Sequence, residues 1–251
     1  MLYTNRMKLI SLNIEADNHF DLVLPFFRAE KPDILCLQEI FRDDISLLED
    51  EVYTCLHYAA LLNIDRPFPQ YRLDGRGQWG VCILVKNELL SRVGQVEEYV
   101  YDGDPNSVPV FETVDSPRRA LLSVKAHTSK KDFTIATTHF VWTKNGETDD
   151  RQRRGLQKLI PKLDSFKPFV FCGDLNAPRG NEAFDTLASH YIDTIPKNIT
   201  TTLDPALHKA GALQLVVDGM FVSEDGLIKE TRVVSGVSDH MALVTEIDGD
   251  L

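Results

Sequence analysis

Short apolar runs recur along this chain, and their enrichment in valine, isoleucine, phenylalanine and threonine favours β-strands over helices. Eight such runs span residues 8–13, 34–38, 81–86, 121–126, 133–138, 169–172, 216–222 and 241–247. Three helix-like segments lie between some of them, at residues 17–28, 42–56 and 150–166. Because helices alternate with strands, while other strands follow one another directly, the pattern predicts a mixed α/β fold rather than an all-β sandwich.

The length and hydrophobic content of the chain indicate a globular protein. With 251 residues, 43% of them hydrophobic, it can bury a substantial core. It has no low-complexity linker and no internal repeat, so we expect one domain over residues 1–251, with residues 1–6 as a dispensable extension. No apolar run approaches the roughly 20 residues of a membrane-spanning helix, and the first residues lack a signal-peptide pattern. We therefore expect a cytoplasmic monomer without a membrane span.

The four cysteines, Cys36, Cys55, Cys82 and Cys172, show no CxxC spacing. Three of them lie inside strand-like runs, where buried, reduced thiols are expected. The sequence therefore predicts neither a disulfide framework nor a zinc site.

The charge balance limits the possible partners. Acidic residues outnumber basic ones by 38 to 27, which gives a formal net charge of −11. This excludes the broadly basic surface that is typical of proteins binding long nucleic acids. An acidic total is compatible with a local basic groove, and with a site that gathers carboxylates around a divalent cation.

Polar side chains suited to metal binding or proton transfer lie at the ends of the apolar runs. They are Asn13, Glu39, His139, Asp174, Asn176, Asp218, Asp239 and His240. Strand ends are rigid, so side chains from several of them can converge. Carboxylates suit Mg2+ or Mn2+ rather than zinc, while imidazole and amide groups can hold a water or a developing negative charge. Together these groups predict metal-assisted attack of water on a phosphorus centre.

Each of these residues also has an ordinary structural interpretation. Residues 173–176 could be a strand leaving into a turn, and Asp239 could cap a turn. His139 could be a structural hydrogen-bonding residue, and Glu39 an exposed charge. These separate interpretations do not explain why all the polar residues lie at strand ends. The set as a whole therefore favours a shared catalytic and metal-binding site.

Seven short motifs follow one another over nearly the whole chain, at residues 11–13 (SLN), 37–39 (LQE), 79–84 (WGVCIL), 138–140 (THF), 173–176 (GDLN), 218–221 (DGMF) and 238–240 (SDH). Because the motifs occur in this order and at these separations, the chain resembles the endonuclease/exonuclease/phosphatase superfamily of Mg2+-dependent phosphoesterases. Within that superfamily it looks similar to the tyrosyl-DNA phosphodiesterase and exonuclease III-like branches. The resemblance implies a DNase I-like fold, a four-layer α/β sandwich of two packed β-sheets flanked by helices.

The resemblance also implies a metal site. Glu39 would be the principal ligand, Asn13 would assist it, and Asp239 would lie near the same ion or a second one. The implied cofactor is Mg2+, with Mn2+ as a substitute.

Five further residues would carry the chemistry in this resemblance. Asp174 would orient or deprotonate the attacking water, and Asn176 would help to align it. His240 would contact the phosphate and stabilise the transition state, with Asp218 fixing its imidazole. His139 would bind another phosphate oxygen.

Two departures from the family pattern concern substrate contacts more than chemistry. Leu12 stands where members often carry tyrosine or tryptophan, although Asn13 is retained. Residues 214–217, before Asp218, lack the basic residue that many members have.

Two features favour a nucleic-acid substrate. Trp142 lies three residues after His139 and could stack on a base, and Arg151, with Arg153, Arg154 and Lys158, could follow a phosphate backbone. Equally, Trp142 could belong to the core and the basic residues could form a solvated helix face.

Three hypotheses follow. The first is a Mg2+-dependent phosphodiesterase acting on nucleic-acid ends, with DNA or nucleotide ends as substrates. The second is a phosphatase or phosphodiesterase of small or lipid-linked phosphoesters, of inositol phosphate or sphingomyelin type, which the net charge of −11 leaves open. The third is a noncatalytic binding module with the same fold, against which the presence of the whole candidate set argues.

Overall fold

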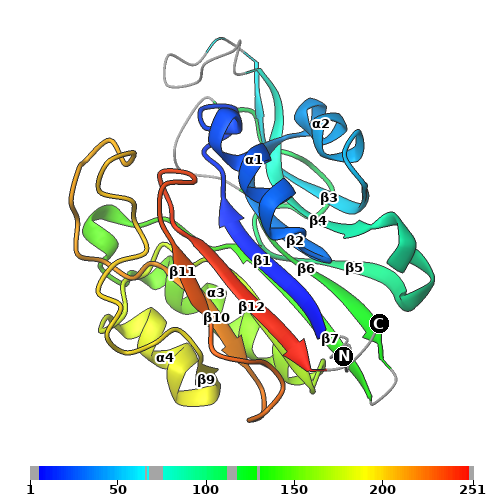
Figure 1. Ribbon diagram of the computed structural model, residues 1–251. Helices are drawn as coiled ribbons and strands as arrows, with labels where there is room; N and C mark the ends of the chain where they lie inside the picture. The colour runs from blue at the N-terminus through cyan, green and yellow to red at the C-terminus, as the bar shows by residue number, and fades with distance from the viewer. Residues whose placement is uncertain (1–5, 66, 68–75, 112–117, 129–130, 249–251) are drawn as a thin grey trace.

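The computed structural model describes residues 6–65, 67, 76–111, 118–128 and 131–248 (Figure 1). Its strands are β1 (Arg6–Asn13), β2 (Ile34–Phe41), β3 (Tyr53–Ile64), β4 (Gly77–Lys86), β5 (Val93–Asp102), β6 (Arg119–His127), β7 (Asp132–His139), β8 (Phe169–Asp174), β9 (Ile192–Asp193), β10 (Asp218–Val222), β11 (Arg232–Val234) and β12 (Ala242–Asp248). Its helices are α1 (Phe20–Glu30), α2 (Ile45–Glu49), α3 (Asp150–Asp164) and α4 (Glu182–His190), with short 3-10 segments at Arg42–Asp44, Asn87–Arg92 and Lys144–Gly146.

Part of the expected extension at residues 1–6 belongs to the fold. Residues 1–5 lie outside the described residues. Arg6 opens β1, where its backbone pairs with Asp248. Its side chain also forms an ion pair with Glu246 at 3.1 Å.

The strands form two mixed sheets of six strands each. The order is β11-β12-β1-β2-β4-β3 in the first sheet and β5-β6-β7-β8-β10-β9 in the second. Each sheet contains one parallel pair, β1 with β2 and β7 with β8, and its other neighbouring strands are antiparallel. Because parallel strands end at the same edge, each pair brings two strand ends together.

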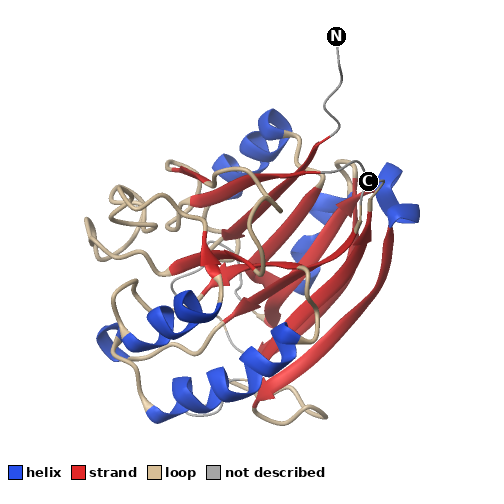
Figure 2. Ribbon diagram, turned by 90° about the horizontal axis from the view of Figure 1, so that it is seen from below, coloured by secondary structure: helices blue, strands red, loops and turns tan. Residues whose placement is uncertain are grey.

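The two sheets pack face to face, and helices cover their outer faces. Alternate residues of β1 point to opposite sides: Leu9 lies in the core between the sheets, in the same buried cluster as Val170 of β8. Ile10 instead packs outward with Val23 of α1. On the far side Leu159 of α3 is fully buried, and Figure 2 shows helices outside the strands on both sides. These layers confirm the predicted four-layer α/β sandwich.

The predicted helices at 17–28 and 150–166 are α1 and α3. Asp149 caps α3, since its carboxylate accepts the backbone N–H groups of Arg151 and Gln152. Helix α1 begins at Phe20 and continues through Pro25, which lies on its exposed face. A helix tolerates the missing N–H of proline more easily there, because the carbonyl left without a donor can reach water.

The predicted helix at 42–56 is wrong in its second half. Only the 3-10 segment and the five-residue α2 form before β3 begins at Tyr53. Residues 53–64 pair along β4 and bury Ala59 and Leu61 between the sheets. This long-range pairing outweighs the local helical preference.

Other elements were not predicted, and one strand begins later than expected. The sequence pattern missed β5, β9, β11 and α4, because β5 carries charged residues and β9 and β11 are very short. The run at 216–222 becomes a strand only from Asp218. Asp218 therefore opens β10 rather than following a strand.

The structure also tests two expectations from the sequence: the state of the cysteines and the lack of a membrane-spanning helix. The four cysteines are free thiols, and Cys36, Cys82 and Cys172 are buried, as predicted. Among the described residues, no helix combines the length and the apolarity needed to cross a membrane. The cytoplasmic location and the monomeric state stay predictions.

Candidate active site

The candidate site forms where strands of both sheets end. Asn13 ends β1 and pairs with Gln38, the neighbour of Glu39 in β2. In the second sheet His139 of β7 and Asp218 of β10 both pair with Asp174, the last residue of β8. Residues scattered along the chain are therefore brought together by strand register.

One asparagine links the two sheets at this edge. Asn13 is 1% exposed, and its Nδ2 donates hydrogen bonds of 3.1 Å to Glu39 Oε1 and to Asp174 Oδ2. Its Oδ1 accepts the backbone N–H of Glu15 at 3.1 Å. The amide thus holds two carboxylates at a fixed separation, and its role as a metal ligand stays a prediction.

Glu39 reaches the site because β2 is irregular at this point. Regular alternation would send Glu39 to the face opposite Gln38. The pairing of β2 with β4 instead shifts register between Gln38 and Ile40, and Glu39 has a left-handed φ of 59°. Such a conformation costs roughly 1–2 kcal/mol for a residue with a Cβ. A bulge of this kind re-aims a side chain next to a functional site.

His139 completes a cluster with these two carboxylates. Its Nε2 lies 3.4 Å from Asp174 Oδ2 and 3.8 Å from Glu39 Oε1. Its ring packs against Trp79 with a centroid distance of 5.3 Å. Within the described residues, its buried Nδ1 has no hydrogen-bond partner.

The predicted pairing of Asp218 with the imidazole of His240 is present. His240 Nδ1 lies 2.9 Å and 3.1 Å from the two carboxylate oxygens of Asp218, and its Nε2 faces Asp174 Oδ2 at 3.8 Å. Burial lowers the pKa of His240, but the charges of Asp218 and Asp174 outweigh it and raise that pKa well above its usual value. The imidazole is therefore held as a cation, with Nε2 on the site side.

Asp174 is held as a carboxylate. Its burial opposes ionisation, but the charge of His240 and the hydrogen bond with His139 outweigh this and lower its pKa. The backbone N–H of Asn176 also donates to Asp174 Oδ1 at 2.8 Å. The side-chain amide of Asn176 donates to the carbonyl of Phe140 at 3.1 Å, so its predicted contact with water stays a prediction.

Asp239 lies in a second acidic group that sequence reasoning missed. Its carboxylate clusters with that of Glu15 and with the imidazole of His19, whose Nε2 lies 3.0 Å from Glu15 Oε2. Burial raises the pKa of Asp239 to about 7; the charge of His240 opposes this rise, and Glu39 and Glu15 add to it. The position of Glu15, two residues after Asn13, was the only available signal, and His19 had none.

Trp142 is a surface residue. Its side chain is 59% exposed, which removes the alternative that it belongs to the core. It follows β7 three residues after His139, so it is available for stacking beside the strand end.

The basic face of α3 is largely engaged within the protein. Arg151 Nε lies 2.7 Å from Asp102, and Arg153 is bonded to Glu182 at 2.7 Å. Lys158 donates to a backbone carbonyl of β5 at 3.0 Å. These contacts leave less positive charge for a phosphate backbone than the sequence suggested.

The donor atoms at the site suit a divalent cation. Glu39, His139 and Asp174 offer ligand atoms that lie within 4.8 Å of one another. Most of these donors are carboxylate oxygens, which hard cations prefer. The raised pKa of Asp239 also reflects repulsion among carboxylates that a bound cation would relieve.

Comparisons with known proteins bear on the fold and the family of the chain. None of the curated proteins compared with the chain matches it. A solved structure of an endonuclease/exonuclease/phosphatase from Bacteroides vulgatus is similar at 16% identity and a TM-score of 0.71, covering 98% of this chain and 99% of that one. The catalytic domain of human nocturnin with bound sulfate has 17% identity and a TM-score of 0.66, covering 96% and 94%. A mannosyl-6-phosphatase from Bacteroides thetaiotaomicron has 14% identity and a TM-score of 0.62, covering 96% and 99%.

At these identities the solved structures show a shared fold. The sequence pattern of the family described as Endonuclease/Exonuclease/phosphatase matches residues 10–240, which is most of the chain. The chain therefore belongs to the endonuclease/exonuclease/phosphatase family and is a hydrolase that acts on phosphoester bonds.

Proposed function

We propose that this hydrolase is a Mg2+-dependent phosphodiesterase that cleaves phosphoesters at nucleic-acid or nucleotide ends. The observation that carries the proposal is the convergence of Glu39, Asp174 and the His240–Asp218 pair at one edge of the sandwich. This edge combines oxygen ligands, a buried cationic donor and a carboxylate that can hold water. These are the groups that hydrolysis at phosphorus requires.

Glu39 would hold the Mg2+ ion, with Asn13 assisting it and Asp239 near the same ion or a second one. A bound Mg2+ ion supplies positive charge that polarises the phosphoester and offsets the charge of the transition state. Both carboxylate oxygens of Asp218 accept the Nδ1–H of His240 and fix its imidazole, so the Nε2–H of His240 would donate to a phosphoryl oxygen. His139 Nε2 faces the same carboxylates and would donate to another phosphoryl oxygen.

Asp174 would orient the attacking water. A carboxylate with a lowered pKa binds a proton weakly, so it is a poor general base but a good hydrogen-bond acceptor. The N–H of Asn176 holds one of its oxygens, which leaves the other facing the site. This role is therefore positional: the carboxylate fixes the direction from which water approaches.

The exposed ring of Trp142 supports a substrate that carries a base. The ion pairs of Arg151 and Arg153 and the net charge of −11 weigh against contacts along a long phosphate backbone. Together these features favour a short substrate or the end of a strand.

The second candidate is a phosphatase or phosphodiesterase of a small or lipid-linked phosphoester. It is favoured by the same internal ion pairs on α3 and by the shared fold with a mannosyl-6-phosphatase. Such a substrate would use the metal and histidine groups without Trp142.

A panel of substrates tests the two candidates. It contains 5′-blocked oligonucleotides, nucleotides, a sugar phosphate, inositol phosphates and sphingomyelin, each assayed with Mg2+, with Mn2+ and with chelator. We expect turnover of base-containing substrates with Mg2+ and none with chelator. Turnover only of sugar, inositol or lipid phosphoesters would favour the second candidate, and turnover of none would contradict both.

Two matched variants, Trp142→Ala and Trp142→Phe, test whether Trp142 stacks on a base of the substrate. Loss of stacking costs about 1–3 kcal/mol per base, so Trp142→Ala should raise KM for nucleotide substrates about 5- to 150-fold. The phenylalanine variant should retain most of the affinity. Equal KM values for all three proteins would contradict a base-stacking role.

A further inference from the structure

His208 lies beside the candidate site although no sequence motif includes it. Its ring meets the ring of His240 edge to face, with a centroid distance of 6.5 Å and an interplanar angle of 73°. His208 is half-buried and belongs to the irregular segment between β9 and β10. It is therefore a nitrogen-bearing side chain that borders the imidazole expected to contact the phosphate.

The segment that carries His208 is fixed to the site at its base. The backbone N–H of Asp204 donates to the carbonyl of Asp239 at 2.8 Å, and the N–H of Met241 donates to the carbonyl of Thr202 at 2.7 Å. Thr202 Oγ1 accepts the backbone N–H of Asp218 at 3.1 Å. These contacts involve Asp218 itself and the two neighbours of His240, so the segment cannot shift without moving the catalytic pair.

Asp204 also shapes the turn that presents His208. Its buried carboxylate accepts the backbone N–H groups of Ala206 at 2.9 Å and of Gly236 at 2.6 Å. The carbonyl of Asp204 accepts the N–H of His208 at 2.9 Å. A buried carboxylate with several N–H donors is a rigid anchor, so the position of His208 is specified by the fold.

The hydrogen bonds of His208 also determine which ring nitrogen carries the proton. The backbone N–H of Ala210 donates to Nδ1 at 3.2 Å, so in the neutral ring the proton is on Nε2. Burial lowers the pKa of His208, and the charges of His240 and Lys209 lower it further. Among the described residues, no hydrogen bond to Nε2 is present. His208 thus offers one unused N–H donor beside the cationic His240.

We propose that His208 is a substrate-contacting residue whose Nε2–H donates a hydrogen bond to an oxygen of the phosphoester bound at His240. The proposal rests on the proposed function of this site. The two histidines then have different roles, because His240 carries positive charge for the transition state and His208 is a neutral donor that holds the substrate in place. A contact made equally in the ground state and the transition state affects KM more than kcat.

Three variants test the contact, using the best substrate of the panel with Mg2+. A hydrogen bond to a charged group is worth about 1.5–3 kcal/mol, so His208→Ala should raise KM, and the inhibition constant of inorganic phosphate, about 10- to 100-fold with kcat near wild type. His208→Gln keeps an amide N–H at a similar distance and should recover most of the loss. Lys209→Gln, in the same turn, should leave both constants unchanged.

Two results would overturn the proposal. One is an unchanged KM in His208→Ala. The other is a fall in kcat with an unchanged KM and a lower melting temperature, which would indicate that His208 only supports the packing of His240. Failure of the proposed function itself is distinct, because the wild-type protein would then show no Mg2+-dependent turnover of any substrate.

Discussion

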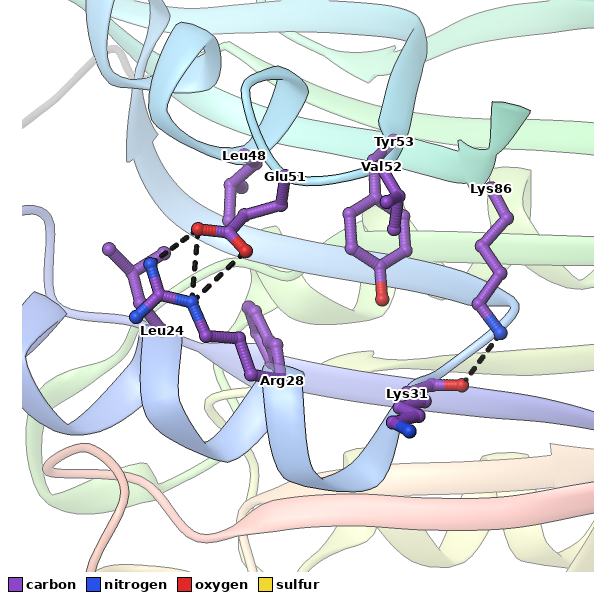
Figure 3. A pocket seen from close by; sticks show the side chains of 9 residues that line it. Leu24, Arg28, Lys31, Leu48, Glu51, Val52, Tyr53 and Lys86 are labelled. Carbon is purple, nitrogen blue, oxygen red and sulfur yellow. Dashed lines mark hydrogen bonds and ion pairs between the residues drawn. The ribbon is translucent and has the colours of Figure 1, made fainter. Parts of the chain in front are cut away.

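The two ends of β2 use charged residues in opposite ways. At one end Glu39 joins the carboxylates of the candidate site. Near the other end, where Tyr53 pairs with Lys86, a pocket of about 270 Å³ lies between α1, the α2 turn and β3. Figure 3 shows Arg28 and Glu51 bonded to each other, and Lys86 bonded to the backbone carbonyl of Lys31. The lining residues are Leu24, Phe27, Arg28, Lys31, Leu48, Glu51, Val52, Tyr53 and Lys86.

The pKa shifts of two carboxylates express this difference. The hydrogen bond with Arg28 lowers the pKa of Glu51, so the surroundings of Glu51 stabilise its ionised form. Burial, together with Glu39 and Glu15, raises the pKa of Asp239 to about 7, against the opposing charge of His240. At the pocket end the charge of Glu51 is therefore stabilised by Arg28, whereas the site end keeps unfavourable charges close together. Such unfavourable groupings are typical of functional sites, which trade stability for activity.

Glu39→Ala should produce the largest effect of any single change. It removes the predicted principal ligand, so hydrolysis with Mg2+ should fall to the rate measured with chelator. The fold should persist, since the side chain of Glu39 is partly exposed and alanine keeps a Cβ, which leaves the strain of the left-handed backbone unchanged. Rates with and without Mg2+, beside circular dichroism, measure both parts. Unchanged turnover would reject the metal assignment.

Asp174→Asn and His240→Ala should each lower kcat by about two to four orders of magnitude, as for lost water-orienting or oxyanion-stabilising groups. Both act on the reacting centre, so kcat should change more than KM. Steady-state kinetics on one substrate separates the two constants. If only KM changed, these residues would bind substrate without taking part in the chemical step.

Leu48→Ala tests the pocket end. Leu48 is 1% exposed and packs in the apolar layer beneath α1. Truncation of such a residue costs about 2–5 kcal/mol in unfolding free energy. Denaturant unfolding should show this loss, while kcat of the folded protein stays at the wild-type value. A parallel loss of kcat would mean that the two ends of β2 are coupled.

Asp239→Asn should stabilise the metal-free protein. A carboxylate whose folded pKa is raised destabilises the fold above that pKa, and this cost disappears as pH falls toward its unfolded value of 3.8. Melting temperatures in chelator should therefore rise at pH 8 and rise less at pH 5. A lower melting temperature at pH 8 would indicate that contacts of the Asp239 carboxylate outweigh the cost of its burial and of its repulsion by Glu39 and Glu15.

The sequence predicted the buried, apolar strands of this fold better than the strands that mix polar and apolar residues. Buried strands such as β2 and β8 are continuous apolar runs, so their pattern identified them without knowledge of their partners. β3 and β5 mix polar and apolar residues, and only their pairing with β4 and β6 makes them strands. Local patterns do not contain that information.

The residues of the candidate site likewise fall into a group that the sequence predicted and a group that it missed. Residues at the ends of apolar strands, such as Asp174 and His139, were predicted, and strand register brings them together. Glu15, His19 and His208 come from irregular segments whose path depends on tertiary hydrogen bonds. The ion pairs that engage the basic face of α3 also join segments far apart in the chain, so the sequence overstated its free positive charge.

Glu51→Gln should have the smallest effect and gives the sharpest control for the comparison. Glu51 is bonded to Arg28 on the protein surface, where ion pairs contribute little. Because its folded pKa lies below the ordinary value of 4.5, the stability it contributes is present above pH 4.5 and is lost as pH falls through the folded pKa. Melting temperatures of wild type and variant should differ slightly at pH 7 and converge at pH 3. Hydrolysis should be unaffected, in contrast to Glu39→Ala, because this carboxylate already has its own cation. A fall in turnover would place the pocket end of β2 within the functional machinery.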